Sequence, residues 1–333
     1  MIEERDQLMV SQNSNQTQTL RKAHFLKPTL DPINQTLPKP PSSLSLSSKP
    51  NINLLKRRVN FKGTTIPQKN WDTWVQNLQQ THENTWKKVG IFDAIRASTC
   101  CIVRDNELIL GLAYNWCTET NTFVFQWGEC SITLEDVMIL GGFSVLGECV
   151  KTPSQNKEIV KFGEKMFNDF LENRSNLKGP VGHYDWMNYF MEIGGELEHM
   201  AFLVLWLSRY VFSTDHYCRI SQCVFPIAIC LARGTRIALA PAVLASIYRD
   251  LSLLKDKIVG FLNEWVATKL VLWAPFQFVQ LWVWERFPTL GPLPISLLDG
   301  EPRLARWRDL KKQKNESCVI HFELLGESVD SWF

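Results

Sequence analysis

Apolar residues between positions 71 and 288 recur with the spacing of an α-helix. The first stripe, at positions i, i+3, i+4 and i+7 of one helix face, consists of Trp71, Trp74, Val75 and Leu78. A longer stripe consists of Leu244, Ile247, Tyr248, Leu251, Leu254 and Ile258. Stripes of this kind bury one side of each helix against its neighbours, so they predict a mainly α fold. We expect a multi-helix globular domain with about ten helices and one or two short β-strands.

Glycine and proline residues divide this pattern into segments. Gly90 is expected to end the first helix, and Pro241 suits the first turn of a later one. The predicted helices lie near residues 71–89, 91–103, 106–117, 134–141, 159–174, 196–212, 226–236, 241–258 and 276–288. One segment differs, because Phe123, Phe125 and Trp127 alternate with other residues and predict a strand with one aromatic face. Residues 176–185 are interpreted as a break between helices.

The stretch 123–147 joins that strand to a short helix that ends at Gly141 and Gly142. Three interpretations fit this arrangement: a phosphate-binding strand–turn–helix, the first half of a DNA-reading helix-turn-helix, or scaffold without chemistry of its own. Thr133 and Asp136 have the spacing of a capping box, with the threonine as N-cap. The two glycines then supply the expected C-terminal stop.

The residues of this stretch favour the scaffold interpretation. The sequence has no GxxxxGK[ST] or GxGxxG motif, and Glu129, directly after Gly128, would repel a phosphate. A DNA-reading motif would need a second helix with Arg, Lys, Asn or Gln at its start, and the residues after Gly147 form a loop with a proline instead. We therefore predict that the stretch sets the angle between two helical layers.

Charge is unevenly distributed along the chain, whose net charge is +2. Residues 1–62 contain ten Lys/Arg and four Asp/Glu, whereas residues 63–333 contain 26 and 30. Because the first segment is also rich in Ser and Pro, we predict that it is a disordered basic arm. The folded domain is predicted to span residues 63–310, followed by a tail at 311–333. Any attraction to polyanions would come from the arm.

Motifs of catalysis and metal binding are absent from the sequence. It has no GxSxG, no CxxC and no cysteine signature with a paired histidine. One cluster lacks the spacing of a zinc site, namely His216, Cys218, Cys223 and Cys230. We therefore assign no catalytic, cofactor-binding or metal-binding residues and expect no cofactor.

The cysteines and the longest apolar runs point to a reducing, non-membrane setting. Several cysteines lie in apolar segments and are interpreted as reduced, buried thiols: Cys100, Cys101, Cys223 and Cys230. Charged residues interrupt every long apolar run, so none gives the 18 or so uninterrupted apolar residues of a transmembrane helix. We expect no membrane span.

Two arginines stand out in the apolar second half of the domain. Arg233 and Arg236 lie in the segment LARGTRIALAP. Because buried arginines need partners, we predict that they pair with acidic residues of neighbouring helices, such as Asp250. The alternative is contact with an external phosphate or a partner.

Three long stretches carry a family resemblance. They are WCTETNTFVFQWGECSITLEDVMILGGFSVLG, VFPIAICLARGTRIALAPAVLASIYRDLSLLK and PFQFVQLWVWERFP. They resemble the plant mobile domain family, also labelled aminotransferase-like, which includes the maintenance-of-meristems-like proteins. The resemblance covers roughly residues 20–310. The positions that match its signature include Trp116, Glu119, Thr120, Phe123, Gly128, Glu129, Thr133, Leu134, Glu135, Asp136, Val137, Gly142 and Gly147.

The resemblance implies a transposon-related origin and a nuclear location. Characterised host members are linked to transposon silencing, gene expression, genome stability and meristem maintenance, and some act with a plant serine/threonine phosphatase of the long-form type. The family has no established catalytic residues. The aminotransferase label is not supported by this sequence, because no lysine stands in the small-residue loop that a pyridoxal enzyme needs. Many relatives continue past the point where this chain ends, which suggests a shortened copy.

Two functions follow as hypotheses. The leading one is a non-enzymatic nuclear interaction domain that works through protein partners. The alternative is a nucleic-acid-binding domain of transposon origin, in which the basic arm together with Arg233 and Arg236 contacts phosphates. A degenerate enzyme is a third, weaker hypothesis.

Overall fold

A computed structural model describes eight stretches of the chain. They are residues 2–9, 19–26, 52–64, 66–125, 128–173, 181–213, 219–263 and 269–310. The chain divides into two compact units, Met1–Ser45 and Leu46–Phe333. The first unit contains an antiparallel hairpin of β1 (Ile2–Met9) and β2 (Thr19–Leu26), in which Ile2 pairs with Leu26.

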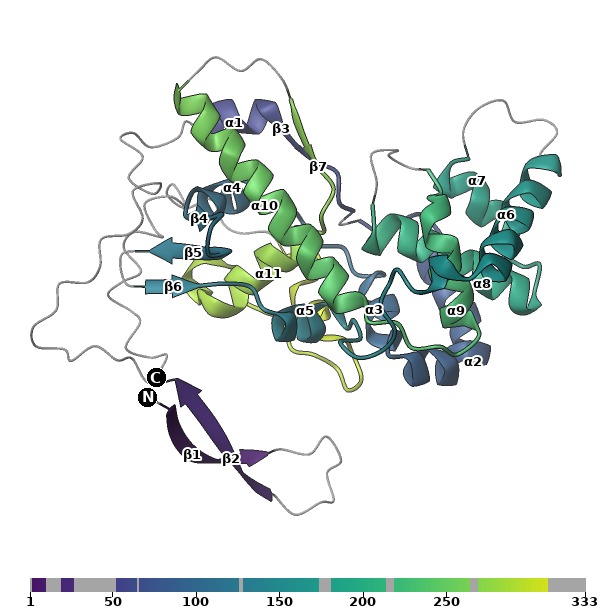
Figure 1. Cartoon of the computed structure of the whole chain (residues 1–333), viewed down its shortest axis with the longest axis horizontal. Coiled ribbons are helices and arrows are strands. Elements are labelled where there is room, and N and C mark those ends of the chain that lie inside the picture. The colour runs from purple at the N-terminus through teal and green to yellow at the C-terminus, as the bar shows by residue number, and fades with distance from the viewer. Residues whose placement is uncertain are drawn as a thin grey trace, which may run out of the picture. The chain divides into compact units, whose positions relative to one another are not determined.

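The second unit is mainly helical, as predicted (Figure 1). Its α-helices are α1 (Ile52–Arg58), α2 (Trp71–Val89), α3 (Phe92–Ala97), α4 (Asn106–Tyr114), α5 (Leu134–Gly141), α6 (Lys157–Glu172), α7 (His183–Phe190), α8 (Gly195–Trp206), α9 (Phe225–Ala232), α10 (Leu239–Asn263) and α11 (Gln277–Arg286). A π-helical turn, Leu207–Val211, continues α8. Short 3₁₀ turns occupy Pro153–Gln155, Gln222–Val224, Pro288–Leu290 and Arg303–Trp307.

The helices of the second unit form two groups (Figure 1). In one group, α8 contacts α7 and α9, α6 contacts α9, and α2 contacts α9. In the other group, the long helix α10 contacts α4 and α5, and α11 contacts the same two helices. The short helix α3 contacts both α2 and α5 and so connects the groups. A single hydrophobic core extends through both.

Helix α2 shows how the predicted stripe is used. All four residues of the stripe are buried, and Gly90 ends the helix in a left-handed conformation with φ 75°. The ring of Trp71 stacks on Phe202 of α8, with ring centroids 4.8 Å apart. Full burial of a large apolar side chain contributes about 1.5–3 kcal/mol, so this face holds α2 firmly against α8.

The strand prediction is confirmed at its centre and incomplete elsewhere. Phe123 and Phe125 are buried on one face of β5 (Thr122–Phe125), and Trp127 lies outside the described residues. The other strands of this unit were not expected from the sequence: β3 (Val59–Phe61), β4 (Trp116–Cys117), β6 (Gly128–Cys130) and β7 (Leu270–Leu272). Strands β4, β5 and β6 form an antiparallel sheet, and β3 pairs with β7 in parallel. Strands of two or three residues are too short to show alternation, and the β3–β7 pair joins distant parts of the sequence.

Several predicted helix bounds need correction. The helix predicted at 106–117 ends at Tyr114, because Trp116 and Cys117 form β4, and the one predicted at 226–236 ends at Ala232. The helix predicted at 91–103 ends at Ala97, because the hydroxyls of Ser98 and Thr99 donate back to the carbonyls of the last turn, at 2.5 Å and 2.7 Å. The predicted break at 176–185 overlaps the start of α7, whose buried residues include Trp186.

The sequence predicts disorder through residue 62, but residues 2–9 and 19–26 form the hairpin of β1 and β2, and residues 52–61 form α1 and β3. Composition averaged over the segment conceals three buried apolar side chains in this stretch: Leu55, Val59 and Phe61. The Phe61 ring packs edge-on against Phe276, with ring centroids 5.1 Å apart. The backbone carbonyl of Phe61 accepts a hydrogen bond from Arg104 at 2.6 Å. The other predicted domain boundaries stay predictions.

Candidate functional site

Helix α5 is fixed at both ends. Thr133 Oγ1 accepts a hydrogen bond from the amide of Asp136 at 3.2 Å, and Asp136 Oδ2 accepts from the amide of Thr133 at 2.8 Å. Asp136 Oδ1 also accepts from Arg286 of α11, at 2.8 Å. At the other end Gly142 has φ 68°, and a Cβ there would lie 2.5 Å from the Ala94 amide nitrogen. The predicted cap and glycine stop are confirmed, and both ends hold α5 against its neighbours.

The aromatic signature residues belong to the framework. Trp116 and Phe123 are fully buried, with ring centroids 4.9 Å apart. Phe123 stacks on Trp282 of α11, at 5.4 Å, and Trp116 Nε1 donates to Ser252 of α10, at 3.1 Å. Because these contacts join the small sheet to both helices, they fix the position of α11 relative to α10.

Two further signature residues lie at the exposed edge of the sheet. Gly128 begins β6 with φ 148°, a backbone conformation that residues other than glycine rarely adopt. Glu129 is exposed and accepts a hydrogen bond from Thr122 Oγ1 on β5 at 2.8 Å. The predicted signature therefore spreads over a sheet edge, an aromatic cluster and a helix cap, and does not converge on one site.

A groove lies between α5 and α11 and is named here the α5–α11 groove. Its volume is about 230 Å³, and it is lined by Asp136, Ile139, Leu140, Trp282, Glu285, Arg286 and Arg303. Two ion pairs border it: Arg286 with Asp136, at 2.8 Å, and Arg303 with Glu285, at 2.6 Å. The groove thus combines apolar side chains with charges that are already paired.

Glu285 is held as a charged acceptor. Its carboxylate accepts hydrogen bonds from Arg303, at 2.6 Å and 3.1 Å, and from Trp307 Nε1, at 2.9 Å. Burial would raise the pKa of Glu285, but these hydrogen bonds and the charges of Arg303 and Arg306 lower it overall. A carboxylate held in this state is suited to structure and recognition, and not to donating a proton.

The outer face of α5 exposes two large apolar side chains beside this groove. Ile139 is 49% exposed and the adjacent Met138 is 40% exposed. Protein interfaces place apolar side chains at their centre and polar groups at their rim, so this face has the composition of an interface on a small scale.

Arg233 and Arg236 are both exposed, and the prediction that they pair with acidic residues of neighbouring helices, such as Asp250, is wrong. Arg233 lies over the Phe162 ring, at 5.5 Å, and the Arg236 guanidinium lies close to Gly90. Among the described residues neither forms an ion pair. Water can solvate an exposed guanidinium, so no buried partner is required.

Asp250 is buried and has other partners. Its Oδ2 accepts hydrogen bonds from the amides of Trp273 and Ala274, both at 2.8 Å, and its Oδ1 accepts from Arg249, at 2.8 Å. The carboxylate therefore anchors the segment that follows β7 to α10. Nothing in the sequence pattern distinguishes this tertiary role from an ion pair with a helix neighbour.

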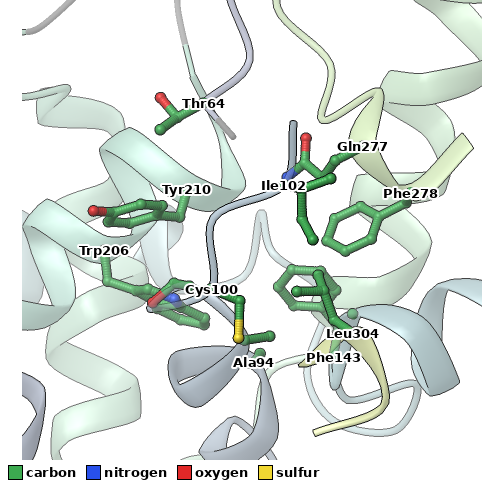
Figure 2. A pocket seen from close by; sticks show the side chains of 13 residues that line it. Thr64, Ala94, Cys100, Ile102, Phe143, Trp206, Tyr210, Gln277, Phe278 and Leu304 are labelled. Atoms are coloured by element: carbon green, nitrogen blue, oxygen red, sulfur yellow. The ribbon is translucent and has the colours of Figure 1, made fainter. Parts of the chain in front are cut away.

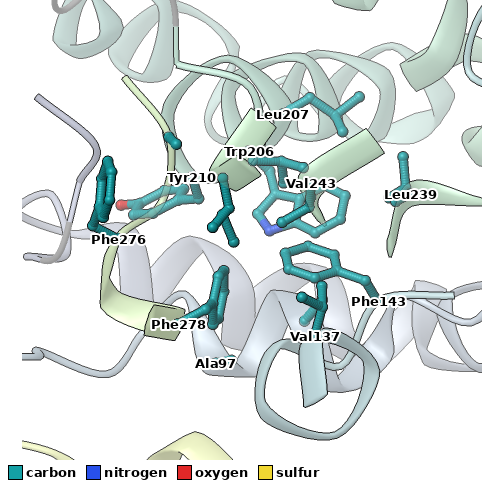
Figure 3. Packing of buried hydrophobic residues seen from close by; sticks show 14 of the residues in the cluster. Ala97, Val137, Phe143, Trp206, Leu207, Tyr210, Leu239, Val243, Phe276 and Phe278 are labelled. Atoms are coloured by element: carbon teal, nitrogen blue, oxygen red, sulfur yellow. The ribbon is translucent and has the colours of Figure 1, made fainter. Parts of the chain in front are cut away.

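A second, mainly apolar pocket lies between the two helix groups (Figure 2). Its cavity volume is only about 30 Å³, and it is named here the Gln277 pocket. Its lining residues come from six separate parts of the chain and include Ala97, Cys100, Phe143, Tyr210, Gln277 and Phe278. Figure 3 shows Phe143, Trp206, Tyr210 and Phe278 among the packed core residues, so the pocket walls are part of the core itself.

The sequence analysis missed Gln277, Ile139 and Glu285. One signal was present for the first, because Gln277 is one of two glutamines in a mainly apolar run that is buried on all sides of α11. A buried amide in such a helix needs hydrogen-bond partners or a ligand. The groove residues carry no comparable signal, since exposed Ile and paired Glu residues are common on helices.

The described residues hold no group of three or more His, Cys, Asp or Glu that could bind a metal ion. His216 and Cys218 of the cluster noted in the sequence lie outside the described residues. Of the predicted buried thiols, Cys230 is buried and Cys100 and Cys101 are half-buried, whereas Cys223, in the 3₁₀ turn before α9, is exposed and its prediction is wrong. No helix in the described part of the chain is long and apolar enough to cross a membrane.

Comparison with known protein families identifies the family of the chain. The plant mobile domain model matches residues 90–332 of the chain. The chain belongs to the plant mobile domain family. The match starts later and ends later than the predicted domain of 63–310, and it includes the segment predicted as a tail. The plant mobile domain thus contains the α5–α11 groove, most of the Gln277 pocket, and both arginines at 233 and 236.

Two curated relatives from Arabidopsis thaliana share this domain. A "Serine/threonine-protein phosphatase 7 long form homolog" is 25% identical over 241 residues, which cover 66% of this chain and 17% of the relative. "Protein MAIN-LIKE 2" is 33% identical over 93 residues, which cover 24% of this chain and 14% of the relative. The chain therefore spans less than a fifth of the length of either relative. No solved structure shows significant similarity to the chain.

Proposed function

We propose that this plant mobile domain is a non-enzymatic interaction domain in the nucleus. It acts through protein partners in gene or transposon silencing, genome stability or meristem maintenance. A plant serine/threonine phosphatase of the long-form type is the proposed partner class. Family membership and the phosphatase-named and MAIN-LIKE relatives support this proposal.

The observation that carries the proposal is the exposed face of α5. Ile139 lines the α5–α11 groove and is nearly half exposed, while the cap at Thr133 and the ion pair from Arg286 hold its helix in place. A rigid, preorganised surface loses little conformational entropy when a partner binds. An apolar partner side chain could enter the groove, and the paired charges around it could orient the rest of the partner.

Co-purification from plant nuclei tests this function. We would compare the wild-type chain with Ile139→Asp, and use Leu253→Asp on α10 as the matched control, because Leu253 is 44% exposed and Ile139 is 49% exposed. We expect the wild type and the control to retain a serine/threonine phosphatase, with and without nuclease. Ile139→Asp should lose it, and direct binding of the purified proteins should repeat this order.

Two results would count against the proposal. Retention of the phosphatase by Ile139→Asp would show that the α5–α11 groove is not the contact. Loss of all partners after nuclease treatment would favour the alternative function instead. Thermal unfolding of each variant establishes that a loss of binding is not a loss of fold.

The alternative function is a transposon-derived nucleic-acid-binding domain. It is favoured by the exposure of Arg233 and Arg236, neither of which has an ion-pair partner among the described residues. Five of the ten basic residues predicted for the arm lie within residues 46–62, which contain no acidic residue and belong to the folded unit. One of these, Lys56, already pairs with Glu107, which reduces the charge available for phosphates.

A further inference from the structure

Positive side chains gather where the C-terminal ends of α2 and α9 lie next to each other. Both helices are followed by a glycine in a left-handed conformation, Gly90 with φ 75° and Gly234 with φ 86°. A Cβ at Gly90 would lie 2.9 Å from a guanidinium nitrogen of Arg236, and a Cβ at Gly234 would lie 3.5 Å from Lys88 Nζ. Lys88 of α2 therefore reaches the turn after α9, while Arg236, just after α9, reaches the turn after α2.

The fold does not use the hydrogen-bond donors of these cations. Backbone amides of the two glycine turns already donate to the last carbonyls of both helices, at 2.9–3.2 Å. Among the described residues, Lys88, Arg233 and Arg236 donate no hydrogen bond and form no ion pair. The negative end of a helix attracts cations, which explains why they lie here without acidic partners. Their donors remain available to an external anion.

Exposed apolar side chains border these three basic residues, which are named here the α2–α9 cation cluster. The Arg233 guanidinium lies over the ring of Phe162 on α6, at 5.5 Å, and Phe162 is itself exposed. On the other side, a Cβ at Gly147 would lie 2.5 Å from the Arg236 carbonyl oxygen, and the preceding residue, Leu146, is exposed. The surface thus combines free cations with apolar contacts, as a site for a charged peptide segment requires.

The charge around the cluster favours a single phosphate over a long polyanion. Residues 63–333 contain 26 Lys/Arg and 30 Asp/Glu, so the domain that carries the cluster is net negative. One exposed carboxylate lies beside the cluster, that of Glu148, whose amide donates to the Arg236 carbonyl at 2.9 Å. A nucleic acid would extend over this acidic surface, whereas one dianionic phosphate needs only the local cations.

We propose that the α2–α9 cation cluster binds a phosphorylated serine or threonine in a segment of a protein partner. A guanidinium can donate to two phosphate oxygens at once, and the lysine adds a compact positive charge. Phe162 and Leu146 would contact apolar side chains that flank the phosphorylated residue. The site is separate from the α5–α11 groove, so it does not depend on the function proposed for that groove.

Isothermal titration of the full chain with two matched peptides tests this site. Both peptides have a leucine on each side of a central serine, and only one carries a phosphate on that serine. Because charge-assisted hydrogen bonds to phosphate are strong, we expect the wild type to bind the phosphopeptide at least about tenfold more tightly than the other peptide. Ile139→Asp should keep this preference, which separates the cluster from the α5–α11 groove.

Three single substitutions place the phosphate at the cluster. Lys88→Gln and Arg236→Gln should each reduce the preference to less than about threefold. Lys87→Gln is the matched control, because it removes the same charge from the adjacent residue, which already pairs with Glu83 at 2.5 Å, and it should keep the preference. Glu148→Gln removes a nearby negative charge and should strengthen phosphopeptide binding by about twofold or more.

Three outcomes would overturn the proposal. The first is equal affinity of the wild type for the two peptides, and the second is a preference that persists in both Lys88→Gln and Arg236→Gln. The third is tighter binding of random-sequence duplex DNA than of the phosphopeptide, with a loss in the same two variants, because it would assign the cluster to nucleic acid. Thermal unfolding shows whether each variant is folded, and the gain expected for Glu148→Gln cannot arise from unfolding.

Discussion

Individual buried polar groups differ in whether the fold satisfies their hydrogen bonds. Gln280 and Asp250 each satisfy backbone groups of a distant segment, and Asp136 joins the cap of α5 to α11. Gln277 does none of this among the described residues. Two titratable side chains are also buried, His183 of α7 and His199 of α8. Single substitutions at these residues should change the free energy of unfolding by different amounts.

The two glutamines of α11 should respond oppositely to replacement by leucine. Gln280→Leu leaves the Asp105 amide and the Val103 carbonyl without partners, so we expect a loss of roughly 2–4 kcal/mol in the free energy of unfolding. Gln277→Leu removes an unsatisfied amide, so we expect a change of less than about 0.5 kcal/mol or a gain. Urea unfolding measures both. Equal destabilisation would mean that Gln277 has a partner in solution.

The buried histidines should make the protein less stable in mild acid. Burial and the charge of Arg209 lower the pKa of His183 to about 4, and burial and His82 lower that of His199 to about 3. Below the unfolded pKa of about 6.5, the unfolded chain binds protons that the folded chain does not. The free energy of unfolding should therefore fall between pH 6.5 and pH 4, by up to about 1.4 kcal/mol per pH unit for each histidine.

The variant His199→Gln checks the origin of this slope. Glutamine preserves an acceptor for Trp86 Nε1, which donates to His199 Nε2 at 2.8 Å, but it cannot bind a proton in this range. Urea unfolding at pH 7, 6 and 5 should show a smaller decrease for the variant than for the wild type. The same slope in both proteins would contradict the assignment to His199.

At the scale of secondary-structure elements, α5 is the element that contributes to both the α5–α11 groove and the Gln277 pocket. Its outer face presents Met138 and Ile139, and its end at Gly141 lines the Gln277 pocket. Helix α11 likewise contributes Gln277 to the pocket and Glu285 to the α5–α11 groove. A helix of only eight residues has little stability of its own, so its caps and tertiary contacts must hold it in place.

The two ends of α5 should differ in their tolerance of substitution. Thr133→Ala removes the cap acceptor and should cost about 1 kcal/mol, while Thr133→Ser should cost much less. Gly142→Val forces a β-branched residue into a left-handed backbone and places its Cβ against the Ala94 amide, so it should cost more than the cap variant. Gly260→Ala in α10 is the control, because a Cβ there meets open space and should stabilise the helix. Thermal unfolding ranks the four variants, and a mild Gly142→Val would refute the steric argument.

At the scale of the whole molecule, the distribution of charge between the two units decides how the nucleic-acid alternative should be tested. Residues 1–45 contain five Lys/Arg and four Asp/Glu, so they are nearly neutral. The excess of positive charge lies at residues 46–62, where α1 and β3 belong to the folded unit and β3 pairs with β7. Deleting residues 1–62 would therefore remove part of the fold along with the charge, and a cut after residue 45 is the cleaner experiment.

Deletion of residues 1–45 should leave both partner binding and nucleic-acid binding nearly unchanged. Removing one phosphate contact reduces the salt slope for duplex DNA by about 0.9, and a nearly neutral segment should supply at most about one or two such contacts. Binding of the full and shortened chains to random-sequence duplex at several salt concentrations measures this slope. Steep salt dependence that survives the deletion but disappears in Arg233→Ala/Arg236→Ala would favour the nucleic-acid function.

The sequence by itself determined the helical class, the buried stripe of α2, the cap at Thr133 and the stop at Gly142, because each depends on residues within about one or two helical turns. It did not determine what distant segments do to one another. The β3–β7 pair, the use of Asp250 as a backbone acceptor and the order of residues 52–61 depend on contacts between residues far apart in the chain. The exposure of Arg233 and Arg236 and the free amide of Gln277 are likewise tertiary outcomes, since local pattern records a polar side chain but not which partner it meets.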